Sequence, residues 1–443
     1  MYPNLYYAIN DWFGWKINAL KIFYTFGIFV ALGFIAAAYF LTLELKRKEK
    51  AGFLQPREEN ITVGEPASTF DLFINALVGF IFGFKLIGAF LASRSPGLDI
   101  QEYIFSTSGN WTGGIIAAGI LVYVKYREKQ KQRLAKPEKR FIRVWPHDRV
   151  GDIIILGLVF GILGAKLFDN LENWDRFIQN PLGNLLSPSG LTFYGGLIFA
   201  AIAICTYAYK KGISILHIID AAAPALMIAY AIGRIGCQVA GDGDWGIYNS
   251  AYISDKPAHV IPASADDFQS KLRQNSNYFL NGLVSDAGGT NEVVTDRHSE
   301  SLDKVPHRSF RGPSFLPTWL FAYTYPHNVN EDGILLNNCE GKYCRALPQP
   351  VFPTPFYETF TCTLLFLFLW LVRRKIKIPG VMFSLYLILN GIERFLVEII
   401  RVNTTYSIFG FHPTQAELIS AALVITGTLG IIIFKKRNKM ITI

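Results

Sequence analysis

The sequence predicts an all-α polytopic membrane protein with about nine transmembrane helices, an outer N-terminus, an inner C-terminus and an extracytoplasmic head inserted between spans. Of its 443 residues, 51% are hydrophobic and 17% are charged, whereas soluble proteins carry about 25% charged residues. The mean hydropathy is +0.26. Basic residues collect in alternate loops between long apolar runs, which is typical of membrane proteins. This composition excludes disordered, collagen-like and disulfide-scaffold proteins, and the net charge of +9 is interpreted as membrane orientation, with no nucleic acid as partner.

The predicted spans are the apolar runs that approach the length needed to cross a bilayer. A helix needs about 20 mainly apolar residues to cross about 30 Å of hydrocarbon. The runs lie at residues 18–43, 71–93, 111–125, 152–170, 191–209, 216–236, 357–372, 380–400 and 414–434.

The loops between these runs indicate the orientation, because Lys and Arg accumulate in short cytoplasmic loops. The strongly basic loops lie at residues 46–50, 125–149, 210–211, 373–377 and 435–439. Nine spans place all five on the inner side, whereas eight or ten spans would divide them between the two sides. The loop from about 240 to 356 is then outside.

These boundaries predict five parts of the chain. They are an N-terminal interfacial segment with the first span (1–60), an inserted transmembrane hairpin with a basic cytoplasmic loop (61–150), core transmembrane helices (151–240), an extracytoplasmic head (241–356) and C-terminal transmembrane helices (357–443). The first residues lack the basic start of a cleavable signal peptide, and their Trp and Tyr side chains are typical of an interfacial belt.

The head is too long for a simple connection, and the sequence does not specify its fold. Within it, Cys339 and Cys344 are candidates for a short disulfide, which an oxidising compartment permits; the alternative is a metal site with these two ligands.

Two of the predicted spans resemble each other. The stretches 71–86 (DLFINALVGFIFGFKL) and 152–167 (DIIILGLVFGILGAKL) share an opening Asp, a late Gly and a Lys at the same offset. Both run from inside to outside, so we interpret them as a parallel duplication of a helical hairpin; chance similarity of two apolar helices is the alternative.

Ionisable residues within or beside spans are functional candidates, because the bilayer makes them expensive. Arg234 lies one turn from the end of a span that runs into the glycine-rich stretch GDGDWG. Arginine suits bidentate binding of phosphate. The substrate-binding candidates in this stretch are Arg234, Gly233, Gly236, Gln238, Asp242 and Asp244. The alternative is an arginine that extends to the interface.

A second polar group lies on residues 390–401. Asn390, Arg394, Glu398 and Arg401 have helical spacing and form one stripe on an apolar helix. Such a stripe faces either a wet substrate cavity or a partner helix as a structural ion pair.

Two further candidates precede or end other spans. Tyr194 lies just before a Gly pair at the outer end of the fifth run, and Lys166 lies in the outer half of the fourth. Tyr194 is alternatively a belt tyrosine, and Lys166 alternatively extends outward. With the predicted orientation, these residues and the three arginines all lie toward the outer leaflet, where a cationic cavity suits a lipid phosphate.

These motifs resemble those of the prolipoprotein diacylglyceryl transferases of bacteria. The stretch GRIGCQVAGDGDWG is similar to the family signature, which opens with Gly-Arg-x-Gly and closes with Trp-Gly. YGGLI at 194–198 resembles the His-Gly-Gly-Leu-Ile of the family, ERFLVEIIR resembles its Arg-Phe-x-Val-Glu-x-x-Arg helix, and FPTPFYE at 352–358 resembles its His-Pro-Ser-Gln-x-Tyr-Glu. Asp220 and Pro224 match the Asp and Pro before the signature, and the motifs follow the family order.

Three positions depart from the family pattern. Tyr194 stands where the family has the histidine proposed as its base, Phe26 stands at the first-span tyrosine with Tyr24 two residues earlier, and Cys237 replaces the signature Asn. One extra residue precedes Trp245. The resemblance therefore implies a diverged subgroup, with a large head and nine spans in place of the usual seven.

The resemblance implies an enzyme that transfers the diacylglyceryl group of phosphatidylglycerol to the lipobox cysteine of a prolipoprotein, releasing glycerol phosphate and leaving a thioether. Arg234 would hold the headgroup, Arg394 would be a second essential cation and Arg401 a helper. The general base stays open between Tyr194, His412, Asp242 or Asp244, and none. Gln238, Glu358 and Gln415 are expected to contact the substrate-binding residues and not the substrate itself.

The implied partners are phosphatidylglycerol, prolipoprotein signal peptides with a lipobox cysteine, and the bilayer, with no cofactor and no metal. The implied location is the bacterial cytoplasmic (inner) membrane, with the active site toward the outer leaflet. The alternatives are a secondary transporter of an anionic solute, for which inverted repeats are common, and a receptor or assembly protein whose head binds a partner.

Overall fold

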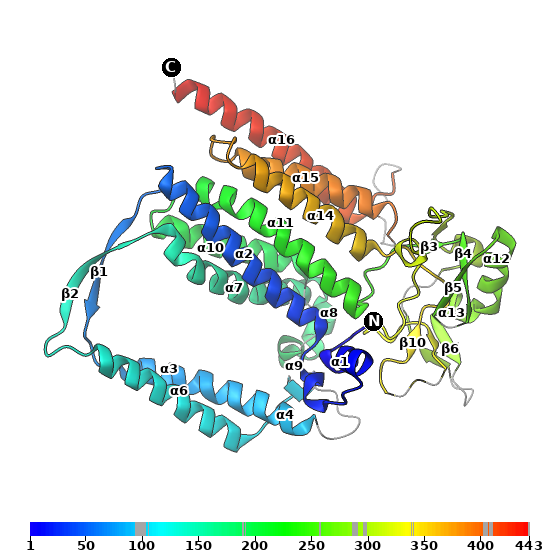
Figure 1. The fold of residues 1–443 in the computed structure, drawn as a ribbon, viewed down its shortest axis with the longest axis horizontal. Helices are drawn as coiled ribbons and strands as arrows, with labels where there is room; N and C mark the ends of the chain where they lie inside the picture. Colours follow the sequence, from blue (N-terminus) through cyan, green and yellow to red (C-terminus); the bar gives the residue numbers. More distant parts are fainter. Residues whose placement is uncertain are drawn as a thin grey trace. The chain divides into compact units, whose positions relative to one another are not determined.

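The computed structural model describes residues 1–93, 103–104, 106–187, 190, 192–256, 258–285, 291–295, 299–337, 339, 341–401, 406 and 411–441. Figure 1 labels its helices and strands. Its contacts divide the chain into two compact units. The head-bearing unit comprises residues 1–8, 23–39 and 219–443, and the hairpin unit comprises residues 9–22 and 40–218.

Long helices form the membrane part of the head-bearing unit. They are the first part of α2 (Thr25–Lys50), most of α11 (Ile215–Ala240), α14 (Thr354–Val372), α15 (Val381–Glu398) and α16 (Gln415–Ile441). Glycines let α15 and α16 approach closely, since a Cβ atom on Gly391 would lie 2.8 Å from the carbonyl oxygen of Ser420. Small residues at such crossings are typical of helix packing in membranes.

A buried carboxylate joins α11 to the start of α15. Asp220 accepts hydrogen bonds from the backbone N–H groups of Gly380 at 2.8 Å and Phe383 at 2.9 Å. A negative charge at a helix N-terminus satisfies free N–H groups and complements the helix dipole. This contact gives a physical role to the Asp that precedes the signature.

The hairpin unit consists of two antiparallel helix pairs and a ribbon. One pair is α3 (Thr69–Phe82), which continues through the π-helical η2 (Gly83–Ile87) and α4 (Gly88–Ala92), with α6 (Trp111–Gln132); the other is α7 (Val150–Glu172) with α10 (Phe193–Lys210). The ribbon pairs β1 (Arg57–Val63) with β2 (Glu138–Val144) in antiparallel register. Shorter helices are α1 (Leu5–Phe13), η1 (Asn18–Ile22), η3 (Pro146–Arg149), α8 (Trp174–Gln179) and α9 (Pro181–Leu186).

The internal repeat predicted from the sequence has a counterpart in hydrogen bonding. In the first hairpin, the ammonium of Lys85 donates to the carbonyl oxygens of Ser106 and Ser108 in the loop before α6. In the second, Lys166 donates to the carbonyl oxygens of Ser187 at 2.9 Å and of Gly190 at 3.4 Å in the loop before α10. Equivalent lysines thus hold equivalent loops, which supports a duplication over chance similarity.

Three of the basic loops are bonded to one another. The side chain of Glu49 lies 2.6 Å from the His147 ring, and Glu59 forms ion pairs with Arg149 at 2.6 Å and Lys211 at 3.2 Å. Arg57 donates to the carbonyl oxygen of Lys210 at 3.0 Å. The loops after the first, third and fifth predicted spans therefore lie at the same end of this unit.

The head contains short elements around small cores. Its elements are β3 (Tyr248–Asn249), β4 (Tyr252–Lys256), β5 (His259–Pro262), α12 (Ala265–Gln274), α13 (Ser276–Asn281), β6 (Leu283–Ser285), β7 (Asn291–Val293), η4 (Leu302–Lys304), β8 (His307–Arg308), η5 (Thr318–Leu320), β9 (Ile334–Leu335) and β10 (Arg345–Ala346). Phe268, Leu272 and Phe279 are at most 2% exposed and form one core. Cys339 and Cys344 form a disulfide, which decides the alternative that the sequence left open.

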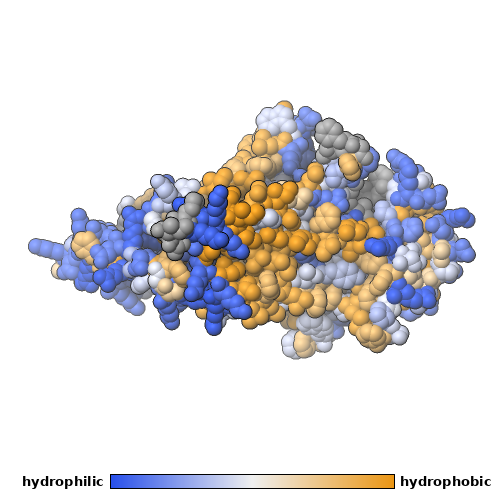
Figure 2. Space-filling model, turned by 90° about the horizontal axis from the view of Figure 1, so that it is seen from above, coloured by the Kyte–Doolittle hydropathy of each residue, from blue (hydrophilic) through white to orange (hydrophobic). Residues whose placement is uncertain are grey.

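Every predicted span falls on a helix, and seven helices are long and apolar enough to cross a membrane. These are Thr25–Lys50, Thr69–Ala92, Pro146–Glu172, Phe193–Lys210, Ile215–Ala240, Thr354–Val372 and Gln415–Lys439. The other two, α6 and α15, are not among these seven; α6 carries five charged residues and α15 carries three. On one face of the molecule, hydrophobic residues gather over the helices (Figure 2). The structure is thus that of a multi-pass membrane protein, while nine spans, the orientation and the five-part division stay predictions.

The first predicted span begins too early. The helix starts at Thr25 and extends to Lys50, whereas the prediction was 18–43. The chain is interrupted before Thr25 because its hydroxyl donates to the carbonyl oxygen of Tyr2 and its N–H donates to that of Pro3. Apolar composition alone does not reveal this contact. Residue 191, the predicted start of the fifth span, lies outside the described residues.

Candidate functional site

Three arginines and three carboxylates meet at the ends of helices in the head-bearing unit. The members of this arginine–carboxylate cluster are Arg234 on α11, Asp244 in the loop that follows, Glu358 on α14, Arg394 and Glu398 on α15, and Arg401 just after α15. Gly241, with φ of +67°, ends α11 in the left-handed conformation and turns the chain back over the helix end. The sequence predicted all of these arginines as site residues, and the structure brings them together.

Arg234 contacts two carboxylates and a tyrosine. Its Nη1 forms an ion pair with Asp244, and its Nε lies 3.0 Å from Oε2 of Glu358. Its guanidinium carbon lies 5.2 Å from the centre of the Tyr230 ring, within the range of a cation–π interaction. Tyr230 is four residues before Arg234, so both lie on the same face of α11.

Glu358 is the centre of the cluster. Its side chain is fully buried, and one oxygen accepts hydrogen bonds from the Tyr230 hydroxyl at 3.0 Å and from Nη1 of Arg394 at 3.3 Å. Nη1 of Arg401 lies 3.7 Å from the same oxygen. The sequence placed Glu358 behind the site, whereas the structure has it in contact with all three arginines.

The loop after α11 places Asp244 between two arginines. The Asp244 carboxylate pairs with Arg234 and, at 2.5 Å, with Nη2 of Arg401. The Thr354 hydroxyl donates to the Asp244 carbonyl oxygen at 2.6 Å, which fixes the loop to the start of α14. Gly246 passes so close to the backbone that an added Cβ would lie 2.5 Å from the Ile400 carbonyl oxygen, so a side chain at this position would displace the loop.

The two aspartates of the loop titrate in opposite directions. Burial raises the pKa of Asp244, but the charges of Arg234 and Arg401 and their hydrogen bonds outweigh burial and lower it to about 2. Burial and the nearby Asp244 charge raise the pKa of Asp242. The arginines therefore hold Asp244 as a carboxylate, while Asp242 carries its charge less readily.

The arginine–carboxylate cluster is internally paired. Each of the three guanidinium groups lies within an ion-pair distance of a carboxylate, and three carboxylates balance three positive charges. We predicted a cationic cavity from the sequence; the described cluster instead holds its cations against its own anions. An anionic ligand that bridges Arg234 and Arg401 at the position of the Asp244 carboxylate would have to displace that carboxylate.

The stripe on α15 is partly as predicted. Arg394 pairs with Glu398 at 2.9 Å, in the i, i+4 spacing of the stripe, and Asn390 lies half-buried one turn earlier. Glu393, off the stripe and only 3% exposed, is buried beside Cys362 of α14. Glu393 and Tyr230 were missed, although Tyr230 has the i−4 spacing to Arg234 that could have identified it.

Other residues of the signature contact protein. Gln238 accepts a hydrogen bond at 2.8 Å from the hydroxyl of Tyr325, a fully buried head residue, and thereby ties α11 to the head. A Cβ on Gly236 would lie 3.0 Å from Cβ of Phe29, so this glycine permits close packing of α2. A Cβ on Gly233 would meet nothing within 4 Å.

Tyr194 and Lys166 belong to the hairpin unit. Tyr194 is half-buried in the first turn of α10. The Lys166 ammonium is held by loop carbonyls, so its contacts are those of a loop-closing residue, and its role in substrate binding stays a prediction. His412, the alternative base, is exposed in the head-bearing unit.

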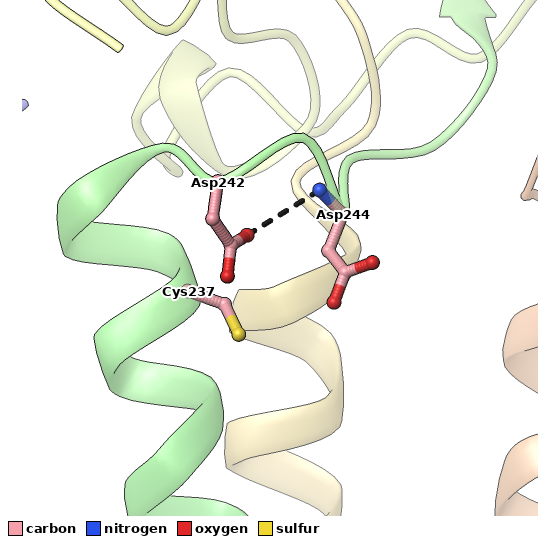
Figure 3. A group of neighbouring side chains, drawn as sticks. All are labelled: Cys237, Asp242 and Asp244. Carbon is pink, nitrogen blue, oxygen red and sulfur yellow. Dashed lines mark hydrogen bonds between the residues drawn. The ribbon is translucent and has the colours of Figure 1, made fainter. Parts of the chain in front are cut away.

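Cys237, Asp242 and Asp244 form a compact group at the end of α11 (Figure 3). One ligand atom of each lies within 4.8 Å of the others, a spacing suited to a metal ion. The sequence predicted no metal. Asp244 already binds two arginines, and Nη1 of Arg234 lies 3.6 Å from the Cys237 sulfur. A cation here would lie beside guanidinium groups, which disfavours a metal ion at this position.

These features define a class: a polytopic helical membrane protein with a buried arginine–carboxylate cluster at the ends of its helices. A family model described as prolipoprotein diacylglyceryl transferase matches residues 100–433, which is most of the chain. The chain therefore belongs to the prolipoprotein diacylglyceryl transferase family.

Individual relatives match shorter stretches. The chain is 35% identical over 124 residues to the phosphatidylglycerol–prolipoprotein diacylglyceryl transferase of Leptospira interrogans, covering 23% of this chain and 39% of that protein. It is 30% identical over 127 residues to the enzyme of Bacillus cereus (28% and 44%) and 29% identical over 154 residues to that of Dehalococcoides mccartyi (34% and 56%). The matched stretches thus span about two fifths to just over half of these relatives' lengths.

Proposed function

We propose that this protein transfers the sn-1,2-diacylglyceryl group of phosphatidylglycerol to the lipobox cysteine thiol of prolipoproteins, the first step of lipoprotein maturation. The cysteine sulfur forms a bond to the glycerol carbon, the carbon–oxygen bond to phosphate breaks, and glycerol phosphate leaves as the thiol loses its proton. Membership of the family and the names of the relatives support this activity. The observation that carries it is that Arg234, Arg394 and Arg401, each on a family-like motif, contact one buried glutamate.

The cluster suits a phosphate leaving group. The phosphate gains negative charge as the carbon–oxygen bond breaks, and fixed cations stabilise that charge best away from water. Asp244 has two oxygens between Arg234 and Arg401, the arrangement that a lipid phosphate would reproduce. We infer that the headgroup replaces the Asp244 carboxylate, while Glu358 continues to hold the arginines.

The route of the thiol proton has three candidate solutions. A free cysteine has a pKa of about 8.5 and must become a thiolate to attack. Tyr194 or His412 would accept the proton, or the arginines would lower the thiol pKa enough without a base. Tyr194→Phe tests the first of these routes, because full activity would exclude Tyr194 as the base.

The proposed setting is the bacterial cytoplasmic membrane, with nine spans, the C-terminus inside and the site toward the outer leaflet. The ion pairs of Glu49 and Glu59 support this topology, because they join three basic loops that it places on one side. The disulfide in the head agrees with an oxidising outer compartment.

The experiment is a reconstituted reaction. Purified full-length protein in micelles, mixed with phosphatidylglycerol and a lipobox peptide, should yield diacylglyceryl peptide and glycerol phosphate by mass spectrometry. A peptide with Ser in place of the lipobox Cys is the substrate control. Arg234→Ala should abolish product, while Lys304→Ala, at an exposed head residue, should not.

Absence of product under conditions where the Bacillus cereus relative is active would overturn the assignment. The predicted alternative, a transporter of an anionic solute, is separated by depletion in cells: loss of the transferase leaves unmodified prolipoproteins, whereas loss of a transporter does not.

A further inference from the structure

A loop of the head, residues 310–321, is closed at its base by one buried side chain. The amide of Asn249 is 0% exposed; its Nδ2 donates to the carbonyl oxygens of Phe310 at 2.8 Å and Phe321 at 3.0 Å, and its Oδ1 accepts from the Phe310 N–H at 3.1 Å. Both ends of the loop therefore meet at Asn249, which makes it a compact Ω-loop. We call residues 310–321 the head loop.

The head loop is also braced between its ends. The N–H of Gly312 donates to the Tyr252 hydroxyl at 3.1 Å. A Cβ on Gly312 would collide with the Phe321 ring, so the glycine allows the first and last segments of the loop to pack against each other. A fixed base presents the remaining side chains in one arrangement.

The outer part of the head loop is apolar and exposed. Phe315 is 81% exposed, the highest value among the large hydrophobic side chains that the structure describes, and Phe310, Leu316 and Trp319 are 48%, 38% and 42% exposed. Such exposure is costly in water and marks a surface that contacts a partner or a membrane.

The charged residues of the head loop and the stretch just before it are all positive. Arg308 and Arg311 are exposed, and residues 305–321 contain no Asp or Glu. Aromatic side chains together with arginines are typical of segments that lie at an anionic lipid–water interface.

The head loop lies at the start of a candidate membrane span. The ring centres of Trp319 and Phe356 are 5.2 Å apart, and the Tyr357 hydroxyl donates to the Leu320 carbonyl oxygen at 2.6 Å. Phe356 and Tyr357 are in the first turn of α14, one of the helices that qualify as spans. The head loop is therefore fixed at the level where α14 enters the bilayer.

We infer that the head loop is an interfacial anchor that inserts Phe315, Leu316 and Trp319 into the outer surface of the bilayer, with Arg308 and Arg311 beside anionic lipid phosphates. Its continuity with α14 favours a lipid surface over a protein partner, because insertion of the span brings the loop to the lipid without any further component. The inference depends on membrane insertion and stands whether or not the proposed transfer reaction is correct.

The test measures the depth of the head loop in the whole protein. Phe315→Cys, in a Cys205→Ser background, is labelled with a polarity-sensitive dye and reconstituted in nanodiscs of phosphatidylglycerol and phosphatidylcholine. Cys237 and Cys362 are buried, and the other two cysteines are in the disulfide. The matched control is Val293→Cys, on β7 of the head and 72% exposed.

We expect the dye at Phe315 to emit as in an apolar medium and to lose most of its emission when the lipid acyl chains are brominated, with little change at Val293. Arg308→Gln with Arg311→Gln should weaken this loss of emission in discs that contain phosphatidylglycerol and leave it unchanged in pure phosphatidylcholine. Lys304→Gln should leave the loss of emission unchanged in both lipids.

An aqueous spectrum and no quenching at Phe315 would overturn the inference, as would equal quenching at both labels. A label that becomes shielded only after a lipobox peptide is added would assign the head loop to the peptide instead of the membrane.

Discussion

At the scale of single residues, sequence reasoning identified cations better than their partners. Arg234, Arg394 and Arg401 were recognisable because the bilayer disfavours charge, so an arginine beside a span needs an explanation. Glu358 was undervalued and Glu393 was missed, because the choice between neighbouring carboxylates depends on which helix faces which. That information arises only when α14 packs against α15, and no local pattern carries it.

Removing the central carboxylate should destabilise the fold. Glu358→Gln keeps the shape but leaves Arg234, Arg394 and Arg401 without the charge that they share. Breaking a buried ion pair from one side typically costs about 3–5 kcal/mol, so thermal unfolding in micelles should show a clear loss. Glu300→Gln is the matched control, since its pair with Lys304 is exposed and contributes little to stability. Similar unfolding temperatures for both variants would refute the central role of Glu358.

The loss of folding stability below about pH 4 should depend on Asp244. Its folded pKa of about 2 lies below the unfolded value of about 3.9, so the unfolded state binds more protons between these values. The stabilisation is therefore complete above about pH 4 and is lost as the pH falls toward 2. Unfolding midpoints measured across this window should fall less steeply for Asp244→Asn than for the native protein.

Asp242 provides the comparison with the opposite sign. Its pKa is raised in the folded state, so its contribution to stability falls as the pH rises through that value. Asp242→Asn should therefore remove the loss of folding stability that the native protein shows at higher pH. It should leave the fall in stability below pH 4 essentially unchanged. Identical falls in stability below pH 4 for the two variants would contradict the assignment of the low pKa to Asp244.

At the scale of elements, the helical hairpin was predictable as a repeated unit. The sequence showed matching Asp, Gly and Lys positions, and the structure adds that Lys85 and Lys166 hold the loops before α6 and α10. Apolar length identified the spans, but their ends were less predictable: the interruption before Thr25 arises from contacts with Tyr2 and Pro3, which lie far along the chain from the predicted span start.

The two lysines allow a matched experiment on the repeat. Lys85→Met and Lys166→Met each remove the hydrogen bonds from an ammonium to loop carbonyls, and bonds of this charged kind contribute about 1.5–3 kcal/mol each. We expect both variants to unfold earlier by similar amounts. If Lys166 also contributes to substrate binding, only Lys166→Met should raise the KM for phosphatidylglycerol in the reconstituted reaction. Equal loss in both assays would leave Lys166 as a loop-closing residue alone.

At the scale of the whole molecule, composition and charge placement predicted a multi-pass membrane protein, but the head could not be derived. Its small cores depend on contacts such as that of Tyr278 with Asp332, which are far apart in sequence and carry no periodic signal. The positions of basic residues predicted which loops lie together, and the ion pairs of Glu59 with Arg149 and Lys211 agree with that grouping.

The predicted topology can be tested at the two predicted spans that are least certain, α6 and α15. The helices α6 and α15 are not among the seven that are long and apolar enough to cross a membrane, so each must be shown to cross it. With nine spans, a fluorescent protein fused after residue 441 should be fluorescent in the cytoplasm, and a label on Val293→Cys, at an exposed head residue, should react from outside in intact cells. A label at Arg133→Cys, at the end of α6, should react only after permeabilisation, since the crossing of α6 carries this basic loop inside. Outside labelling at Arg133 would remove α6 from the spans and reverse the order of loops after it, because each lost span exchanges the two sides for all that follows.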